Sequence, residues 1–168
     1  MISFIDTPAK EKEFLVLTEG SAIGCKLQAL AKAYGFHQNF IQFWSDGCAA
    51  YCLLDSELSI SGRVHDPEEA RAFVSMLGPE AVLCQEETAQ LLGLRQRLGG
   101  PVLMKALSAG TRYPLPAWPK IDQIWELLKS SGLISSESQF EPFYLDLSHR
   151  LRHGCAIAAG EFCGERLA

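Results

Sequence analysis

The sequence lacks both a long apolar run and a block of basic residues. No stretch approaches the ~20 apolar residues that a helix needs to span a bilayer, and residues 1–10 lack the basic start and apolar run of a signal peptide. Fifteen Lys and Arg against twenty Asp and Glu give a net charge of −5, which argues against a surface for nucleic acid or anionic membrane. We therefore expect a cytoplasmic protein that binds neither nucleic acid nor membrane.

The sequence also lacks the cysteine pattern of a disulfide framework. A chain of 168 residues buries about 70% of its unfolded surface and needs no disulfides to hold its core. Cys48 and Cys52, four residues apart, would point to the same face of a strand, and a radical-type iron–sulfur motif would need a third cysteine where Asp55 stands. We expect reduced, buried thiols at all six cysteine positions, namely 25, 48, 52, 84, 155 and 163.

Strand and helix signals alternate along the chain. Asp46-Gly47 predicts a hairpin turn, and Asp66 before Pro67 predicts the start of a helix. Strands are expected over residues 1–6, 40–44, 48–54, 58–64, 81–84, 101–107 and 155–162. Helices are expected over residues 7–15, 21–34, 67–77, 86–92, 120–131 and 138–153, the last with a capping box from Ser138 and Glu141. The fold class is therefore α/β (α+β), a mostly antiparallel mixed sheet with helices packed against it.

One segment carries a family resemblance. Residues 140–156, FEPFYLDLSHRLRHGCA, run from an amphipathic helix into a strand, and they resemble the junction between the two halves of a two-part protein of the GNAT acetyltransferase superfamily. Residues 66–94 and 99–107 are similar to parts of the N-terminal half. The resemblance implies a GNAT-like domain over residues 1–108, a Pro-rich linker over 109–119, and over 120–168 two helices with the opening strand of a second, truncated GNAT half.

The same resemblance sets expectations for the cofactor. GNAT enzymes hold the acetyl-CoA pyrophosphate with Q/R-x-x-G-x-G/A, whose backbone amides lie at a helix N-terminus. Residues 96–101, QRLGGP, come closest, but Pro101 has no N–H. We therefore expect no cofactor for this chain alone, and acetyl-CoA for the intact family member. Gly20 and Gly24 offer a weaker anion cradle, and an ordinary loop-to-helix junction explains them better.

Four residues form the best candidate site, His149, Arg150, Arg152 and His153. The two histidines stand at i and i+4, a spacing that can ligate zinc, but the arginines oppose a cation and Arg150 replaces the glutamate of H-E-x-x-H. The cluster could instead receive an anion or a carboxylate of another domain. We favour a third interpretation, in which these cations cap the helix and pair with Asp146 or Glu161.

Three functions remain open at this point. The first is the non-catalytic N-terminal part of a GNAT-family N-acetyltransferase, whose partner is the missing C-terminal GNAT half and whose catalytic residues cannot be assigned here. The second is a binding or assembly module that forms a homodimer through its terminal strand. The third is a small enzyme or metal site that uses His149 and His153.

Overall fold

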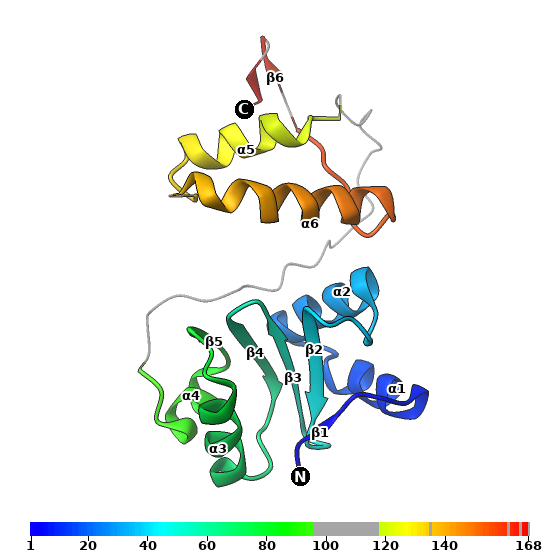
Figure 1. The fold of residues 1–168 in the computed structure, drawn as a ribbon, viewed down its shortest axis with the longest axis vertical. Helices are drawn as coiled ribbons and strands as arrows, with labels where there is room; N and C mark the ends of the chain where they lie inside the picture. The colour runs from blue at the N-terminus through cyan, green and yellow to red at the C-terminus, as the bar shows by residue number, and fades with distance from the viewer. Residues whose placement is uncertain (96–117, 135, 161, 165, 168) are drawn as a thin grey trace. The chain divides into compact units, whose positions relative to one another are not determined.

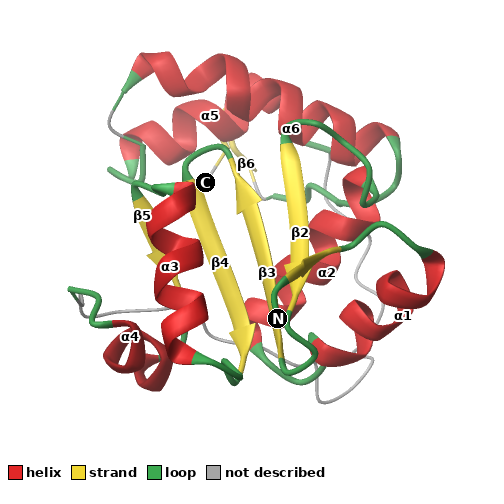
Figure 2. Cartoon of the chain, turned by 60° about the horizontal axis from the view of Figure 1, so that its bottom comes forward, coloured by secondary structure: helices red, strands yellow, loops and turns green. Residues whose placement is uncertain are grey.

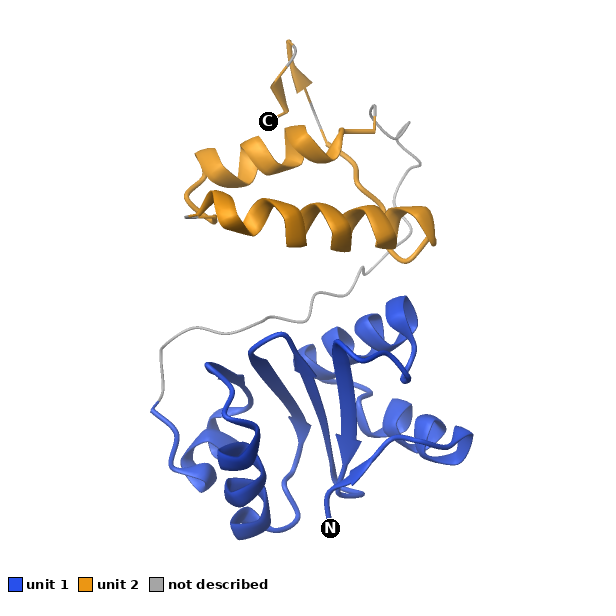
Figure 3. Cartoon of the chain, in the orientation of Figure 1, with its two compact units in different colours: residues 1–105 blue, residues 106–168 orange. Residues whose placement is uncertain are grey.

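The computed structural model describes residues 1–95, 118–134, 136–160, 162–164 and 166–167. The chain divides into two compact units, Met1–Lys105 and Ala106–Ala168, which are described separately (Figure 3). The predicted strand over residues 101–107, the QRLGGP motif and most of the predicted linker over 109–119 lie outside the described residues.

The first unit contains a five-stranded mixed sheet in the order β1-β2-β3-β4-β5 (Figure 1). Neighbours from β1 to β4 run antiparallel, while β4 and β5 run parallel. The predicted α/β fold with a mostly antiparallel sheet is therefore confirmed. The strands are β1 (Ser3–Phe4), β2 (Ile41–Ser45), β3 (Ala49–Leu54), β4 (Glu57–Gly62) and β5 (Ala81–Leu83).

Helices cover both faces of this sheet (Figure 2). One face packs against α1 (Pro8–Leu17) and α2 (Ala22–Tyr34) in a core that includes Phe14, Leu27 and Phe43. The other face packs with α3 (Pro67–Leu77) and α4 (Glu86–Leu92) in a core built on Tyr51, Leu58 and Ile60. Two cores form because successive strand residues point to opposite faces, so Tyr51 and Cys52 belong to different layers.

Short-range signals in the sequence fix several of these elements. The Ser21 hydroxyl accepts a hydrogen bond from the Gly24 amide at 2.8 Å and begins α2. Asp66 caps α3 in the same way, with Pro67 at its first position. Gly47, with φ of +87°, occupies the β2–β3 turn as predicted.

The second unit is a pair of helices followed by a small hairpin. Its elements are α5 (Ile121–Ser130), the 3₁₀ turn η1 (Glu137–Gln139), α6 (Phe140–Arg152), β6 (Phe162–Cys163) and β7 (Arg166–Leu167). Trp125 of α5 is buried against Phe140 and Phe143 of α6, with ring centroids 5.1 and 5.3 Å apart. No helix in the described parts of the chain has the length and apolar character to cross a membrane.

Two local predictions in the second unit are wrong. The capping box of Ser138 and Glu141 does not form, because Ser136 caps the preceding η1 turn and its hydroxyl bonds to that of Ser138 at 2.7 Å. Residues 155–160 do not form a strand either. The amides of Cys155 and Ala156 donate to the Arg150 carbonyl at 2.8 and 3.2 Å, so this backbone closes the helix end instead of joining a sheet.

The cysteine prediction is partly wrong as well. All six thiols are free, but Cys25, Cys48 and Cys163 are exposed and only Cys52 is fully buried. Cys48 lies in the β2–β3 turn, where its amide donates to Asp46 Oδ1 at 2.8 Å. It therefore does not share a strand face with Cys52.

Candidate functional sites

The predicted basic cluster lies at the C-terminal end of α6. The rings of His149 and His153 stand 4.5 Å apart between centroids, as the i, i+4 spacing predicted. Arg150 Nε donates to Asp146 Oδ1 at 2.9 Å, which is one of the two predicted pairings; Glu161 lies outside the described residues. Arg152 and His153 are exposed at the end of the helix. The cluster thus has the arrangement of cations at a helix C-terminus, where the dipole favours positive charge.

Zinc requires three or four ligands in most protein sites. In the described ranges, no group of three or more His, Cys, Asp and Glu side chains is placed to hold a metal ion. The histidine pair of α6 therefore stands without a further ligand from those residues, beside two arginines whose charge opposes a cation.

The N-terminus of α3 follows the end of β4, the strand that pairs in parallel with β5. In α/β folds this strand-to-helix junction is where a phosphate binds, because the first amides of the helix are free. Here Asp66 Oδ1 accepts from the amides of Glu68 and Glu69 at 2.9 and 3.2 Å, and Pro67 has no N–H. The three carboxylates at this junction, of Asp66, Glu68 and Glu69, repel an anion, so the charge here opposes a pyrophosphate.

Gly20 lies before α2 at φ of +77°, where nothing crowds it, and Gly24 lies in the first turn of α2, where it serves packing. The Gly24 amide is occupied by the Ser21 hydroxyl. A Cβ on Gly24 would lie 1.9 Å from the Thr18 carbonyl oxygen, so the residue permits a close backbone approach. This geometry favours the loop-to-helix junction over the anion cradle.

Asp46 organises a network that the sequence did not reveal. Its Oδ1 accepts from the amides of Cys48 at 2.8 Å and Ala49 at 2.6 Å, and its Oδ2 accepts from the Tyr51 hydroxyl and the His65 amide, both at 3.0 Å. Burial alone would raise the pKa of Asp46, but these four hydrogen bonds together hold it below its usual value. Burial, and then the Asp46 charge, raise the pKa of Tyr51 far above its ordinary range, so this hydroxyl stays protonated. The network joins the β2–β3 turn to the loop before α3.

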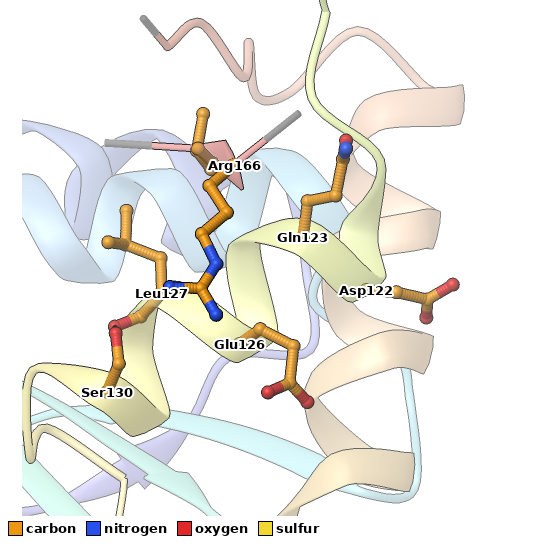
Figure 4. A pocket seen from close by; sticks show the side chains of 7 residues that line it. Asp122, Gln123, Glu126, Leu127, Ser130 and Arg166 are labelled. Atoms are coloured by element: carbon orange, nitrogen blue, oxygen red, sulfur yellow. The ribbon is translucent and has the colours of Figure 1, made fainter. Parts of the chain in front are cut away.

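The second unit has an open groove of about 450 Å³ along α5 (Figure 4). Figure 4 shows the Arg166 side chain reaching from β7 to α5, near Leu127 and Glu126. None of its lining residues is buried, so its polar groups remain solvated. The lining residues are Asp122, Gln123, Glu126, Leu127, Ser130, Arg166 and Leu167.

The first unit has a smaller pocket of about 270 Å³ between α2 and the β3–β4 hairpin. Lys26 pairs with Glu57 Oε1 at its wall, and Ser59 Oγ donates to the same oxygen at 3.1 Å. Cys52, only 1% exposed, lines the pocket, and burial raises the pKa of its thiol to about 12. The thiol is therefore protonated at neutral pH and is no nucleophile. The lining residues are Lys26, Leu30, Cys52, Leu54, Asp55, Ser56, Glu57 and Ser59.

Comparisons of the chain with protein-family models, with curated proteins and with solved structures found no match in any of the three.

Proposed function

We propose that the first unit is a non-catalytic GNAT-like domain that works with a separate, acetyl-CoA-binding GNAT half. The order of its elements supports this: one strand, two helices, three antiparallel strands, a helix, a parallel strand and a further helix. This arrangement agrees with the mostly antiparallel mixed sheet and packed helices that the GNAT resemblance implies, with β4 and β5 paired in parallel.

The closed N-terminus of α3 carries the non-catalytic part of the proposal. A pyrophosphate needs several free amides that point at it. At the junction after β4, Asp66 already satisfies two of them and Pro67 has none. In this proposal, residues 1–95 of the first unit supply a GNAT-like scaffold, and the α3 N-terminus described here does not serve as the pyrophosphate site.

The chemistry of acetyl transfer then belongs to the partner half. In the GNAT family an acetyl group passes from acetyl-CoA to an amine, with a base that deprotonates the amine and backbone amides that stabilise the oxyanion. None of these roles is assigned to a residue of this chain. The role of the first unit in this proposal is to shape the acceptor cleft or to dock the partner half.

A thermal-shift titration with acetyl-CoA tests the absence of a cofactor site. A ligand at a hundred times its Kd stabilises a protein by ~2.7 kcal/mol, which raises the midpoint of a chain this long by at least ~5 °C. We expect no saturable rise, and the same flat response for Asp66→Ser, which keeps the cap without its charge. A saturable rise with acetyl-CoA in the unaltered protein would show that it holds a cofactor site of its own and would end the proposal.

The hairpin of the second unit supports an assembly module as a second candidate. Within the described residues, β6 and β7 form a two-stranded sheet that pairs only with itself, through Phe162–Leu167 and Cys163–Arg166. A two-stranded sheet with open edges is a template for a further strand. Light scattering across a concentration series separates the candidates, because a monomer at every concentration excludes a homodimer built on this hairpin.

A further inference from the structure

The pocket between α2 and the β3–β4 hairpin carries charges of both signs. Lys26 of α2 and Glu57 of β4 are 31 residues apart, and the fold brings them together at one wall. Their side chains remain 40% and 43% exposed, so water and a solute can reach both. An exposed ion pair of this kind contributes little to stability.

Both partners keep unused hydrogen-bonding capacity. The Lys26 ammonium has three N–H donors, and one of them is given to Glu57 Oε1. Within the residues that the structure describes, Glu57 Oε2 accepts no hydrogen bond, and the neighbouring Asp55 carboxylate accepts none either. A ligand could therefore pair with the lysine and with the carboxylates without breaking the ion pair.

The rest of the pocket lining limits the size and polarity of a ligand that fits. Leu30 and Leu54 supply an apolar wall, while Ser59 and Cys52 line it with only 2% and 1% of their surface exposed. The Cys52 thiol makes no hydrogen bond to any described residue, and at 1% exposure it forms part of the closed floor of the pocket. The pocket volume of about 270 Å³ lies just below the ~300–1,000 Å³ of sites for drug-sized ligands, so the pocket suits only a small ligand.

We propose that this pocket binds a small zwitterion of the α-amino acid class with an apolar side chain. The ligand carboxylate accepts from the Lys26 ammonium, and the ligand ammonium donates to Glu57 Oε2 and Asp55. Its side chain lies against Leu30 and Leu54. This binding goes beyond the proposed GNAT role and does not depend on it, because no step requires acetyl-CoA or a partner half.

Isothermal titration calorimetry with three matched probes tests the proposal. L-Leucine has both charges, 3-methylbutylamine lacks the carboxylate, and 4-methylpentanoate lacks the ammonium. We expect saturable binding of L-leucine, and binding of each single-charge probe weaker by about tenfold or more, because each loses a hydrogen bond to a charged group.

Variants of the ion pair identify the pocket. Lys26→Met and Glu57→Gln should each weaken L-leucine binding by about tenfold or more. Lys12→Met and Glu13→Gln make the same chemical changes at exposed positions of α1 outside the pocket. They should leave the affinity for L-leucine unchanged. The thermal unfolding midpoint of each of the four variants should be measured to check that the variant is folded.

Three results would overturn the proposal. The first is the absence of saturable heat from L-leucine up to about 10 mM, well beyond a millimolar Kd. The second is equal affinity for 3-methylbutylamine, which would mean an amine site without carboxylate recognition. The third is unchanged L-leucine binding by folded Lys26→Met and Glu57→Gln, which would place the ligand elsewhere.

Discussion

Replacing Asp46 should strongly destabilise the first unit. The carboxylate accepts four hydrogen bonds, and two of them come from outside its own turn, from the Tyr51 hydroxyl and the His65 amide. Asp46→Ala removes all four acceptor positions and leaves the hydroxyl of the fully buried Tyr51 without its partner.

The size of the effect follows from these contacts. A hydrogen bond to a charged group is worth ~1.5–3 kcal/mol, and an unpaired buried polar group costs ~1–3 kcal/mol. Because the four bonds share one carboxylate, their contributions do not add, and we expect a loss of about 3 kcal/mol or more. Tyr51→Phe removes the hydroxyl but leaves Asp46 with its three amide donors, so it should cost only about 1 kcal/mol.

Acid should produce the same loss in the unaltered protein. The pKa of Asp46 lies below its usual value of 3.8, so the unfolded chain takes up this proton at a higher pH than the folded one. The stabilising contribution of Asp46 is complete above about pH 5, at which the unfolded carboxyl is ionised, and is lost as the pH falls through the folded pKa. Asp46→Asn should flatten this part of the stability profile.

Urea unfolding, followed by hydrogen exchange in peptides from β3 and β4, measures the stability of the first unit alone. Asp55→Asn is the matched control, because Asp55 lies in the β3–β4 turn and accepts no hydrogen bond from the described residues; its effect should stay within ~0.5 kcal/mol. A loss below about 1 kcal/mol for Asp46→Ala would refute the reasoning. Purely additive effects of Asp46→Ala and Tyr51→Phe would refute it too, because the two residues share a bond.

Two further predictions concern the close approach of Gly62, at the end of β4, to the β2–β3 turn and the reactivity of the thiols. Gly62→Ala should lower the free energy of unfolding by about 2–3 kcal/mol, because φ there is +100° and a Cβ would lie 2.6 Å from the Cys48 carbonyl oxygen. Gly47→Ala, at φ of +87° with no atom within 4 Å, should lower it by only about 1 kcal/mol. Equal losses of stability in urea unfolding would contradict the close approach at Gly62. Ellman's reagent at pH 8 should modify Cys25, Cys48 and Cys163 first and Cys52 last, because Cys52 is buried and its pKa is raised to about 12. Mass spectrometry of digests gives the order, and Cys52 reacting as fast as Cys48 would show that the core opens there.

Much of the first unit could be predicted because its signals act over a few residues. Ser21 and Asp66 cap α2 and α3 through amides two or three positions away, and Asp46-Gly47 makes the β2–β3 turn where the pattern placed it. The second unit shows the limit of such rules. Ser136 and Ser138 both suit a helix start, and the η1 turn decided between them.

The sequence by itself determined the fold class, the caps and the turn, because each depends on atoms that chain connectivity already holds close together. Only the tertiary structure decided the partners of Asp46 beyond its turn and the meeting of Lys26 with Glu57. His65 is 19 residues from Asp46, and Glu57 is 31 residues from Lys26. No spacing rule reaches that far, because the pairing of β2, β3 and β4 and the packing of α2 on them set these distances.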